Sequence, residues 1–411
     1  MKVCDYVASF LSNEGVETVF SIPGGGCIFL CDSLSRQDEI EVVVNHHEQA
    51  CAIAAEGYAR VKNNIGACLV TSGPGGSNAW TGTLCSYQDS VPVVVISGNV
   101  NKSMTTNYTG LSNLRQLGDQ EFNVVETVKN FTKYAVQVND PNKIKYHLQK
   151  AFHEARTGRP GPVWIDIPLD VSTSKIDVNS LENFSPKQEQ LEDAEYDLII
   201  EKIKTSKKPV FIVGNGVRLS NSIEVLERIL EKHKIPVVTS VNGKDNISGE
   251  YFLNMGTFGT AGNISANKIL QESDLVLSLG SRLYVRQIGY NFKSFAENAF
   301  KIYVDIDKEE LDKPTLYPDL KVNMDVKNFL KTIEGKIEIS NIKPWRERCS
   351  LIKETSPVVL DRHRNSDILS IYSVLESINK HMHEDLVVVT SDGSANVCGM
   401  QVLKTKKKQR L

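Results

Sequence analysis

The chain has 411 residues, of which 41% are hydrophobic and 24% charged, and its formal net charge is −3. This length suggests two or three domains, and the composition is that of an ordinary globular protein. The charge balance gives no indication of nucleic acid or of an acidic membrane as a partner. No apolar run approaches the ~18 residues of a membrane span, and the first residues lack a signal-peptide core. We therefore expect a cytoplasmic protein.

The eight cysteines indicate buried thiols in a reducing compartment rather than a zinc site. None of them forms a Cys-x-x-Cys pair, and several lie in apolar runs; they stand at positions 4, 27, 31, 51, 68, 85, 349 and 398.

In the first 170 residues, strand-like apolar runs alternate with helical segments. The pattern predicts helices at 3–14, 47–60, from 77 onward and at 141–156, and strands at 16–22, 42–44, 66–71, 91–97 and 163–167. Solid runs of Val and Ile alternating with helices are typical of a parallel sheet that is covered on both faces. The expected fold class is therefore α/β with doubly wound parallel sheets.

Glycine-rich or acidic segments directly follow three of these predicted strands. They are Pro23-Gly24-Gly25-Gly26, the segment that contains Glu48, and Thr71-Ser72-Gly73-Pro74-Gly75. Ligands of parallel sheets bind beyond the carboxyl ends of the strands, so the three segments are expected on one edge. Neither glycine run has a Gly-x-Gly-x-x-Gly fingerprint or the Lys of a P-loop, which disfavours a nucleotide-binding dehydrogenase.

Glu48 opens a helix whose next residues, 50–55, are small and apolar, and such a helix is normally packed on every side. A single Glu at this place is usually a charge that the helix dipole favours, but a buried functional acid would stand there too. Glu48 is expected at the same edge of the sheet as two glycine-rich strand ends, and this position favours the functional interpretation. Glu56 and Arg60, one turn apart, are predicted to form a surface ion pair.

These segments resemble the pyrimidine-binding domain of thiamine-diphosphate enzymes, and within them the acetolactate synthase large subunit. The resemblance rests on His47-Glu48-Gln49-Ala50, Gly57-Tyr58-Ala59-Arg60 and the segment 71–78. It implies that Glu48 hydrogen-bonds N1′ of the cofactor's aminopyrimidine, which favours the tautomer that removes the thiazolium C2 proton. The other residues that it places at thiamine diphosphate here are Pro23, Gly24, Gly25, Thr71, Gly73 and Asn78.

The resemblance implies a transferase that decarboxylates pyruvate and joins the two-carbon unit to a second 2-oxo acid, in branched-chain amino acid biosynthesis. Gln120 matches the active-site Gln of the family's Phe-Gln-Glu tripeptide. Asp119 replaces the aromatic residue, however, and Leu169 stands where the family typically has a Lys. A non-oxidative 2-oxo acid decarboxylase is therefore the alternative.

Residues 171–196 are polar and predicted to be a linker. The following unit, 197–340, has strands predicted at 209–213, 235–239, 274–279 and 301–305, and helices predicted at 222–232 and 262–271. It resembles the Rossmann-like central domain of the family, which in acetolactate synthases binds FAD in a structural role. Positions that align with FAD contacts are Arg159, Gly214, Gly216, Gly256, Arg282, Arg286 and Asp305.

The flavin assignment has an alternative, a flavin-free structural domain. The family's Arg-Phe-Asp-Asp-Arg appears here as Arg282-Leu283-Tyr284-Val285-Arg286, so both acids are missing. Phe258 stands where the family has His. We expect weak or absent FAD binding.

After a charged segment predicted as a second linker, 341–365, residues 366–411 resemble the start of the family's diphosphate-binding domain. A helix is predicted at 367–382 and a strand at 386–390, followed by Ser391-Asp392-Gly393-Ser394-Ala395-Asn396. This segment is similar to the family's Mg²⁺ motif, but only 18 residues follow Gly393, too few to reach the partner Asn. Gly393 and Ser394 are instead expected at thiamine diphosphate, with the Mg²⁺ ligands beyond the chain end.

This organisation predicts that the chain alone is inactive, because the resembled active site is assembled between two subunits. A homodimer or homotetramer, with a possible regulatory subunit, is the expected assembly. The rival from another class is a truncated, non-catalytic fragment that retains dimerisation or partner binding.

Overall fold

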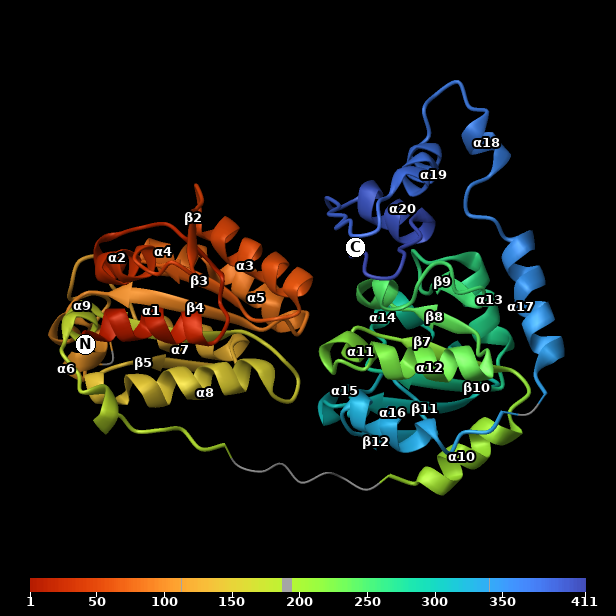
Figure 1. Cartoon of the computed structure of the whole chain (residues 1–411), viewed down its shortest axis with the longest axis horizontal. Coiled ribbons are helices and arrows are strands. Elements are labelled where there is room, and N and C mark those ends of the chain that lie inside the picture. Colours follow the sequence, from red (N-terminus) through yellow and green to blue (C-terminus); the bar gives the residue numbers. More distant parts are fainter. Residues whose placement is uncertain (112, 187–193, 340) are drawn as a thin grey trace. The chain divides into compact units, whose positions relative to one another are not determined.

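The computed structural model describes residues 1–111, 113–186, 194–339 and 341–411. It consists of two compact units, Met1–Glu189 and Gln190–Leu411. Each unit holds one six-stranded sheet, and helices alternate with the strands along the chain (Figure 1). All pairs of neighbouring strands in both sheets are parallel. The predicted doubly wound α/β fold is confirmed.

The first sheet has the strand order β2-β1-β3-β4-β6-β5. Its strands are β1 (Thr18–Ser21), β2 (Glu41–Val44), β3 (Gly66–Val70), β4 (Val93–Asn99), β5 (Tyr134–Gln137) and β6 (Val163–Pro168). Five of the six follow the predicted strands closely. The sixth, β5, was not predicted, because it is a short edge strand whose residues are all half-buried.

Helices cover both faces of this sheet, and each face has its own apolar core. One core contains side chains of α1 (Val3–Asn13), α2 (Ile28–Ser35) and α8 (Ile144–Arg156). The other contains side chains of α3 (Glu48–Lys62), α5 (Trp80–Gln88) and α7 (Val124–Val128). Strand residues alternate between the two cores, since successive side chains of a strand point to opposite faces.

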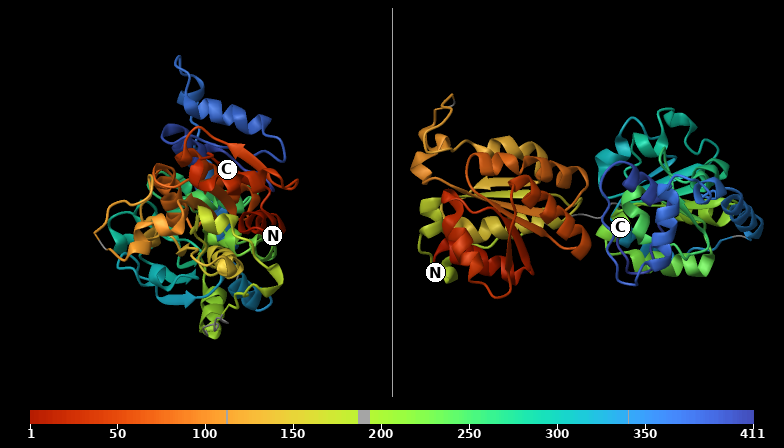
Figure 2. Two further views of the ribbon diagram at one scale, coloured as in Figure 1. Left: turned by 90° about the vertical axis from the view of Figure 1, so that its left-hand side faces the viewer. Right: turned by 90° about the horizontal axis from the view of Figure 1, so that it is seen from above.

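Figure 2 shows the two units from two further directions.

Helix α3 begins at Glu48 because His47 is extended and its Nδ1 accepts a hydrogen bond from the Gln49 amide at 3.1 Å. It ends where Asn63 adopts a left-handed φ of 53°. The expectation that this apolar helix is packed on every side is wrong for the isolated chain. Ala52, Ala55 and Ala59 are buried, but Ala50 is exposed, Ile53 is 46% exposed and Val61 is 41% exposed.

The predicted surface pair of Glu56 and Arg60 is also corrected by the structure. Glu56 is only 9% exposed, and the Arg60 guanidinium donates to Glu56 Oε1 and, at 2.6 Å, to Asp89 Oδ2 at the end of α5. The two carboxylates raise the pKa of Arg60 against the opposing effect of burial. The pair therefore ties α3 to α5.

The second sheet has the order β12-β11-β10-β7-β8-β9. Its strands are β7 (Pro209–Val213), β8 (Val237–Thr239), β9 (Asn254–Thr257), β10 (Leu275–Leu279), β11 (Phe300–Asp305) and β12 (Leu320–Asn323). Side chains of α10 (Tyr196–Thr205), α12 (Ile223–His233) and α16 (Val326–Glu334) form one core, and α13 (Ile264–Glu272) and α17 (Lys343–Thr355) contribute to the other. The edge strands β9 and β12 were not predicted.

Parts of both segments predicted as linkers are packed into the units. In the first, Ile176 and Leu181 are buried in a core, while residues 187–193 lie outside the described residues. In the second, α17 buries Trp345 and Cys349, and its Lys353 donates to the carbonyl oxygens of Phe252 and Asn254. Amphipathic helices in charged segments are easily overlooked, since the apolar stripe is narrow.

The last 50 residues form a small cluster of α19 (Ile371–His381) and α20 (Ser394–Val402). The predicted helix is present, but the predicted strand 386–390 is wrong. Only Val387 pairs there, with Arg410 in an isolated bridge, and Val389 is 88% exposed. An apolar run becomes a strand only where neighbouring backbone satisfies its hydrogen bonds.

All eight cysteines have free thiols, and six of them are buried, as predicted; Cys31 is half-buried and Cys85 exposed. None of the helices in the described part of the chain combines the length and hydropathy needed to span a bilayer.

Candidate functional site

Three loops meet at the carboxyl edge of the first sheet. They follow β1, β2 and β3, and β1 is hydrogen-bonded to both of the others. The chain reverses its direction across the sheet between β1 and β3, which is where ligands of doubly wound sheets bind. The structure therefore brings together the glycine loop after Ile22, the start of α3 and the loop from Thr71 to Gly75, as the sequence predicts.

The first and third loops are in direct contact. Thr71 Oγ1 accepts a hydrogen bond from the Gly26 amide at 3.1 Å. A Cβ atom on Gly24 would lie 2.6 Å from Cβ of Thr71, so a side chain at position 24 would displace one loop from the other. Glycine at this position lets the two backbones approach each other and leaves the edge open.

Glu48 lies half-buried in the first turn of α3, and its Oε2 accepts a hydrogen bond from Asn78 Nδ2 at 2.9 Å. Asn78 ends the short helix α4 (Pro74–Asn78). Within the described residues, no hydrogen bond reaches the other oxygen, Oε1. A Cβ atom on Gly75 would lie 3.5 Å from that oxygen, so the missing side chain leaves space beside it. Glu48 is thus oriented by one partner and open on its other side.

Gln120 lies against the same edge through its backbone. Gly73 has φ +64°, and a Cβ atom there would lie 2.0 Å from the Gln120 carbonyl oxygen, so only glycine fits. Gln120 itself has a left-handed φ of 57°, and its side chain is exposed. The structure therefore places the Gln120 backbone against Gly73, while a role of its side chain in the active site stays a prediction.

The residue that holds this loop, Glu121, was not predicted as a site residue. It is buried, and its carboxylate accepts hydrogen bonds from the amides of Thr106 at 3.1 Å and Leu117 at 2.9 Å. An acid that accepts from backbone amides fixes a loop firmly, because charged acceptors make the stronger hydrogen bonds. The feature of the sequence that could have indicated a buried acid is the position of Glu121, directly between Gln120 and the aromatic Phe122.

A second buried acid, Asp166 on β6, lies inside the sheet and was also missed. Its carboxylate accepts hydrogen bonds from Ser97 Oγ (2.6 Å), Asn99 Nδ2 (2.8 Å) and Gln137 Nε2 (2.9 Å), on β4 and β5. Burial raises its pKa, while the three donors act in the opposite direction. An acid inside the apolar run of β6 was the available signal. Asp166 joins three strands of the sheet on which the site is built.

The donor set at the edge fits an aminopyrimidine ring. A carboxylate with one open oxygen can share a proton with a ring nitrogen, and the glycines around it leave room for a flat ring. Two sequence families match the chain: "Thiamine pyrophosphate enzyme, N-terminal TPP binding domain" over residues 1–125 and "Thiamine pyrophosphate enzyme, central domain" over residues 196–333. The first covers the loops described above.

Curated relatives extend the match over nearly the whole chain. The acetolactate synthase large subunit of Lactococcus lactis is 32% identical over 410 residues, which cover 98% of this chain and 69% of the relative. A probable acetolactate synthase large subunit of Methanocaldococcus jannaschii is 31% identical, with coverages of 99% and 69%. The chloroplastic acetolactate synthase of Arabidopsis thaliana is 33% identical, with coverages of 87% and 53%. The chain belongs to the acetolactate synthase large subunits.

In this acetolactate-synthase-type chain, the flavin candidates of the central unit show a mixed fit. Gly214 and Gly216 follow β7 and pack against Gly280 after β10, a glycine cradle at the switch point of the second sheet. Ser281 Oγ, beside this cradle, is buried without a hydrogen-bond partner within the described residues. An orphaned polar atom at a glycine cradle suits a phosphate-bearing ligand.

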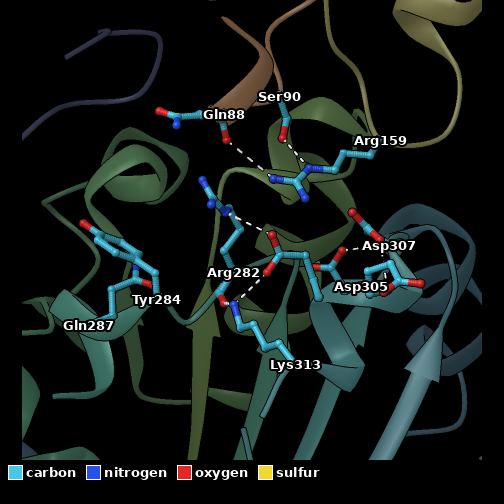
Figure 3. Close-up of polar contacts among 11 residues, drawn as sticks. Gln88, Ser90, Arg159, Arg282, Tyr284, Gln287, Asp305, Asp307 and Lys313 are labelled. Atoms are coloured by element: carbon cyan, nitrogen blue, oxygen red, sulfur yellow. Dashed lines mark hydrogen bonds and ion pairs between the residues drawn. The ribbon is translucent and has the colours of Figure 1, made fainter. Parts of the chain in front are cut away.

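Three of the remaining flavin candidates, Arg159, Arg282 and Asp305, have partners within the protein. Arg282 forms an ion pair with Glu310 at 3.1 Å, and Glu310 also binds Lys313 (Figure 3). Asp305 Oδ1 accepts from the Asp307 amide at 3.0 Å, and Arg286 is exposed. In the first unit, Arg159 donates to Ser90 Oγ at 2.8 Å and to the Gln88 carbonyl (Figure 3). Weak or absent FAD binding stays a prediction.

Two further groups of candidates lie elsewhere in the second unit. Gly256, with φ +99°, lines a cavity beside Asn263. Gly393, with φ +81°, directly precedes α20, which Ser394 begins. Within the described residues, no group of three or more His, Cys, Asp or Glu side chains is arranged to hold a metal ion.

Proposed function

We propose that the protein is a thiamine-diphosphate-dependent carboligase that decarboxylates pyruvate and transfers the two-carbon unit to a second 2-oxo acid. Membership of the acetolactate synthase large subunits supports this assignment. The single observation that carries it is Glu48, whose carboxylate is oriented by Asn78 and open toward Gly75.

Each residue at the edge has a distinct task in this proposal. Thiamine diphosphate, when bound, supplies a nucleophilic carbon and an electron sink for decarboxylation. Glu48 Oε1 holds a proton at the pyrimidine nitrogen, while Asn78 keeps the carboxylate in place through Oε2. Gly24 and Gly73 let the surrounding loops pack closely, because a Cβ atom at either position would meet Thr71 or Gln120. Gln120, carried on the loop that Glu121 anchors, is the residue that we expect to contact the substrate.

The residues expected to bind the second 2-oxo acid, the acceptor, differ from those of the resembled family. Asp119 is exposed beside Gln120 on the loop that lies against Gly73, and it adds a negative charge where the family has an aromatic ring. A carboxylate there disfavours a second anionic 2-oxo acid by like-charge repulsion. This observation keeps the non-oxidative decarboxylase as the second candidate.

A product assay separates the two candidates. The chain aligns with 69% of the Lactococcus relative, so the assay uses this chain and, beside it, a chimera that continues with the relative's remaining residues. With thiamine diphosphate, Mg²⁺ and pyruvate, we expect the chimera to form acetolactate. Acetaldehyde as the main product would favour the decarboxylase. No product from a folded chimera that binds the cofactor would contradict both.

We further propose a homodimer formed through the outward faces of α3 and α5. Both helices expose large apolar side chains, each more than 40% accessible: Ile53, Val61, Leu84 and Tyr87. The two helices pack closely, since a Cβ atom on Gly82 would lie 2.6 Å from Cβ of Ala52. Apolar side chains that gather on neighbouring helices mark a protein contact more often than a solvated surface. A homotetramer, a regulatory subunit and a cytoplasmic location stay predictions.

Replacing Ile53 by Asp is expected to convert the dimer into a monomer, because a buried unpaired carboxylate opposes association strongly. Light scattering coupled to gel filtration measures the mass. Val178→Asp, which places the same charge at another exposed position of the first unit, is the control and should leave the mass unchanged. An Ile53→Asp protein that keeps the dimer mass would contradict the proposed surface.

A further inference from the structure

A cavity of about 520 Å³ lies within the second unit, and its size is that of a small-molecule site. Its walls are β9, the short helix Val241–Asn246, α17, α19 and the segment that follows α20. Of the flavin candidates in this unit, Gly256 lines the cavity, whereas Gly214, Gly216 and Arg282 are not among its described lining residues. The cavity is therefore distinct from the glycine cradle.

The charge of the cavity wall is strongly unbalanced. Among the described lining residues, five are basic: Lys244, Lys353, Arg364, Lys380 and Lys404. Two are acidic, Glu354 and Glu376, which leaves a formal surplus of three positive charges. Glu376 is bound by Arg364 at 2.6 Å, so its charge is already shared. A surplus of like charges around one cavity attracts an anion.

Lys244 shows this imbalance most clearly. No hydrogen bond within the described residues holds its ammonium group. Its sequence neighbour Asp245 is engaged by Arg218 at 3.1 Å and by Arg410 at 2.7 Å. Burial lowers the pKa of Lys244 to about 8, with Lys404 adding to the decrease and Asp245 opposing it. Lys244 is thus a half-buried cation, and the carboxylate of the adjacent Asp245 is already shared with two guanidinium groups.

Two of the other three lining lysines, Lys353 and Lys404, are held in place by hydrogen bonds. Lys353 Nζ donates to the carbonyl oxygens of Asn254 at 2.8 Å and Phe252 at 3.2 Å. The Lys404 amide donates to Asn379 Oδ1 at 2.9 Å, and the adjacent Thr405 carbonyl accepts from the Gly249 amide at 2.7 Å. Burial lowers the pKa of Lys353, and Lys404 lowers it further. These contacts keep the lysines near one another despite their repulsion.

Apolar side chains complete the wall: Ile247, Val358, Val359, Val402 and Leu403. Lysines bind phosphate as point charges, while an apolar wall buries a carbon body. We propose that this cavity is a binding site for a small organic phosphate, whose phosphate group lies among Lys244, Lys353 and Lys404. Nothing in the proposal depends on the reaction at Glu48.

Calorimetric titration of the full chain with phenyl phosphate tests this site, because the probe combines a dianionic head with an apolar ring. We expect phenyl phosphate to bind at least about tenfold more tightly than inorganic phosphate, since only the former fills the apolar part, and more tightly than benzoate, which carries one charge. Lys244→Met and Lys404→Met should each weaken the binding about tenfold or more, the value of one lost charged hydrogen bond.

Two variants serve as controls. Lys244→Arg keeps the charge and should keep most of the affinity. Lys331→Met removes an exposed lysine of α16 outside the cavity and should bind like the wild type. Circular dichroism melts confirm that each variant is folded. Absent binding of phenyl phosphate, or equal binding by folded Lys244→Met and Lys404→Met proteins, would overturn the proposal.

Discussion

Replacing Glu48 by Gln is expected to lower the rate of C2-proton exchange of bound thiamine diphosphate by about 10²–10⁴, the range of a lost general acid–base group. The amide keeps the size of the side chain and can still bind Asn78, but it cannot hold a proton at the pyrimidine nitrogen. The fold and the cofactor affinity should change little. Nuclear magnetic resonance of the chimera with bound cofactor measures the exchange rate directly.

Glu126→Gln is the matched control for this experiment. Glu126 also lies in the first turn of a helix of the same unit, α7, where the Asn123 side chain caps its amide, but it is exposed and apart from the edge. Its replacement should leave the exchange rate unaltered. An exchange rate of wild-type size in Glu48→Gln would remove Glu48 from the proposed role and, with it, the central support for the carboligase.

Replacing Asp166 by Ala is expected to lower the free energy of unfolding of the first unit by about 3 kcal/mol, because several buried donors lose their acceptor together. Asp166 is 1% exposed and accepts from Ser97, Asn99 and Gln137. Urea unfolding followed by tryptophan fluorescence measures the loss, since Trp164 Nε1 donates to Ser97 Oγ at 2.9 Å beside this carboxylate.

The pH dependence of this effect has a definite sign. Burial raises the pKa of Asp166 above 3.8, its value in the unfolded chain. The protonated carboxyl group of Asp166 therefore stabilises the folded state. This contribution is fully present below pH 3.8 and is lost as the pH rises through the pKa of the folded state. The difference between wild type and Asp166→Ala should therefore narrow from acidic to neutral pH. A difference that widens over the same range would mean that the carboxylate is stabilised in its ionised form.

Asp140→Ala is a suitable control for the Asp166 experiment. It removes an exposed carboxylate that accepts from the Asn142 amide at the start of a short helix. The loss of such a cap costs about 1 kcal/mol. An equal loss of stability in the two variants would show that burial and the three side-chain donors contribute nothing beyond local capping.

How much of the fold could be predicted depended on burial. The strands β3, β4 and β6 are buried along their whole length, so their apolar runs were recognisable. The edge strands β5, β9 and β12 mix half-buried and polar residues, and their runs are too short to stand out. The opposite error occurred at 386–390, where an apolar run lacks the neighbours that would make it a strand.

The residues of the candidate site also fall into those that could be predicted from the sequence and those that could not. Glu48, Gly24 and Gly73 could be named because each directly follows a predicted strand, and the carboxyl ends of parallel strands share one edge. The resemblance then added Gln120 and Asn78. The roles of the buried acids Glu121 and Asp166 were missed, because the sequence shows each acid but not its hydrogen-bond partners; those of Asp166 lie 29 to 69 residues away in the chain.

By itself, the sequence determined the class of fold, the edge of the first sheet and the family, because periodicity and short motifs are local properties of the chain. Only the tertiary structure decided which charges are buried. Glu56 became part of a tie between helices, Asp166 joined three strands, and Lys244 was placed in one cavity wall with four other basic residues. The physical reason is that the cost of burying a charge depends on groups that the fold brings from distant positions.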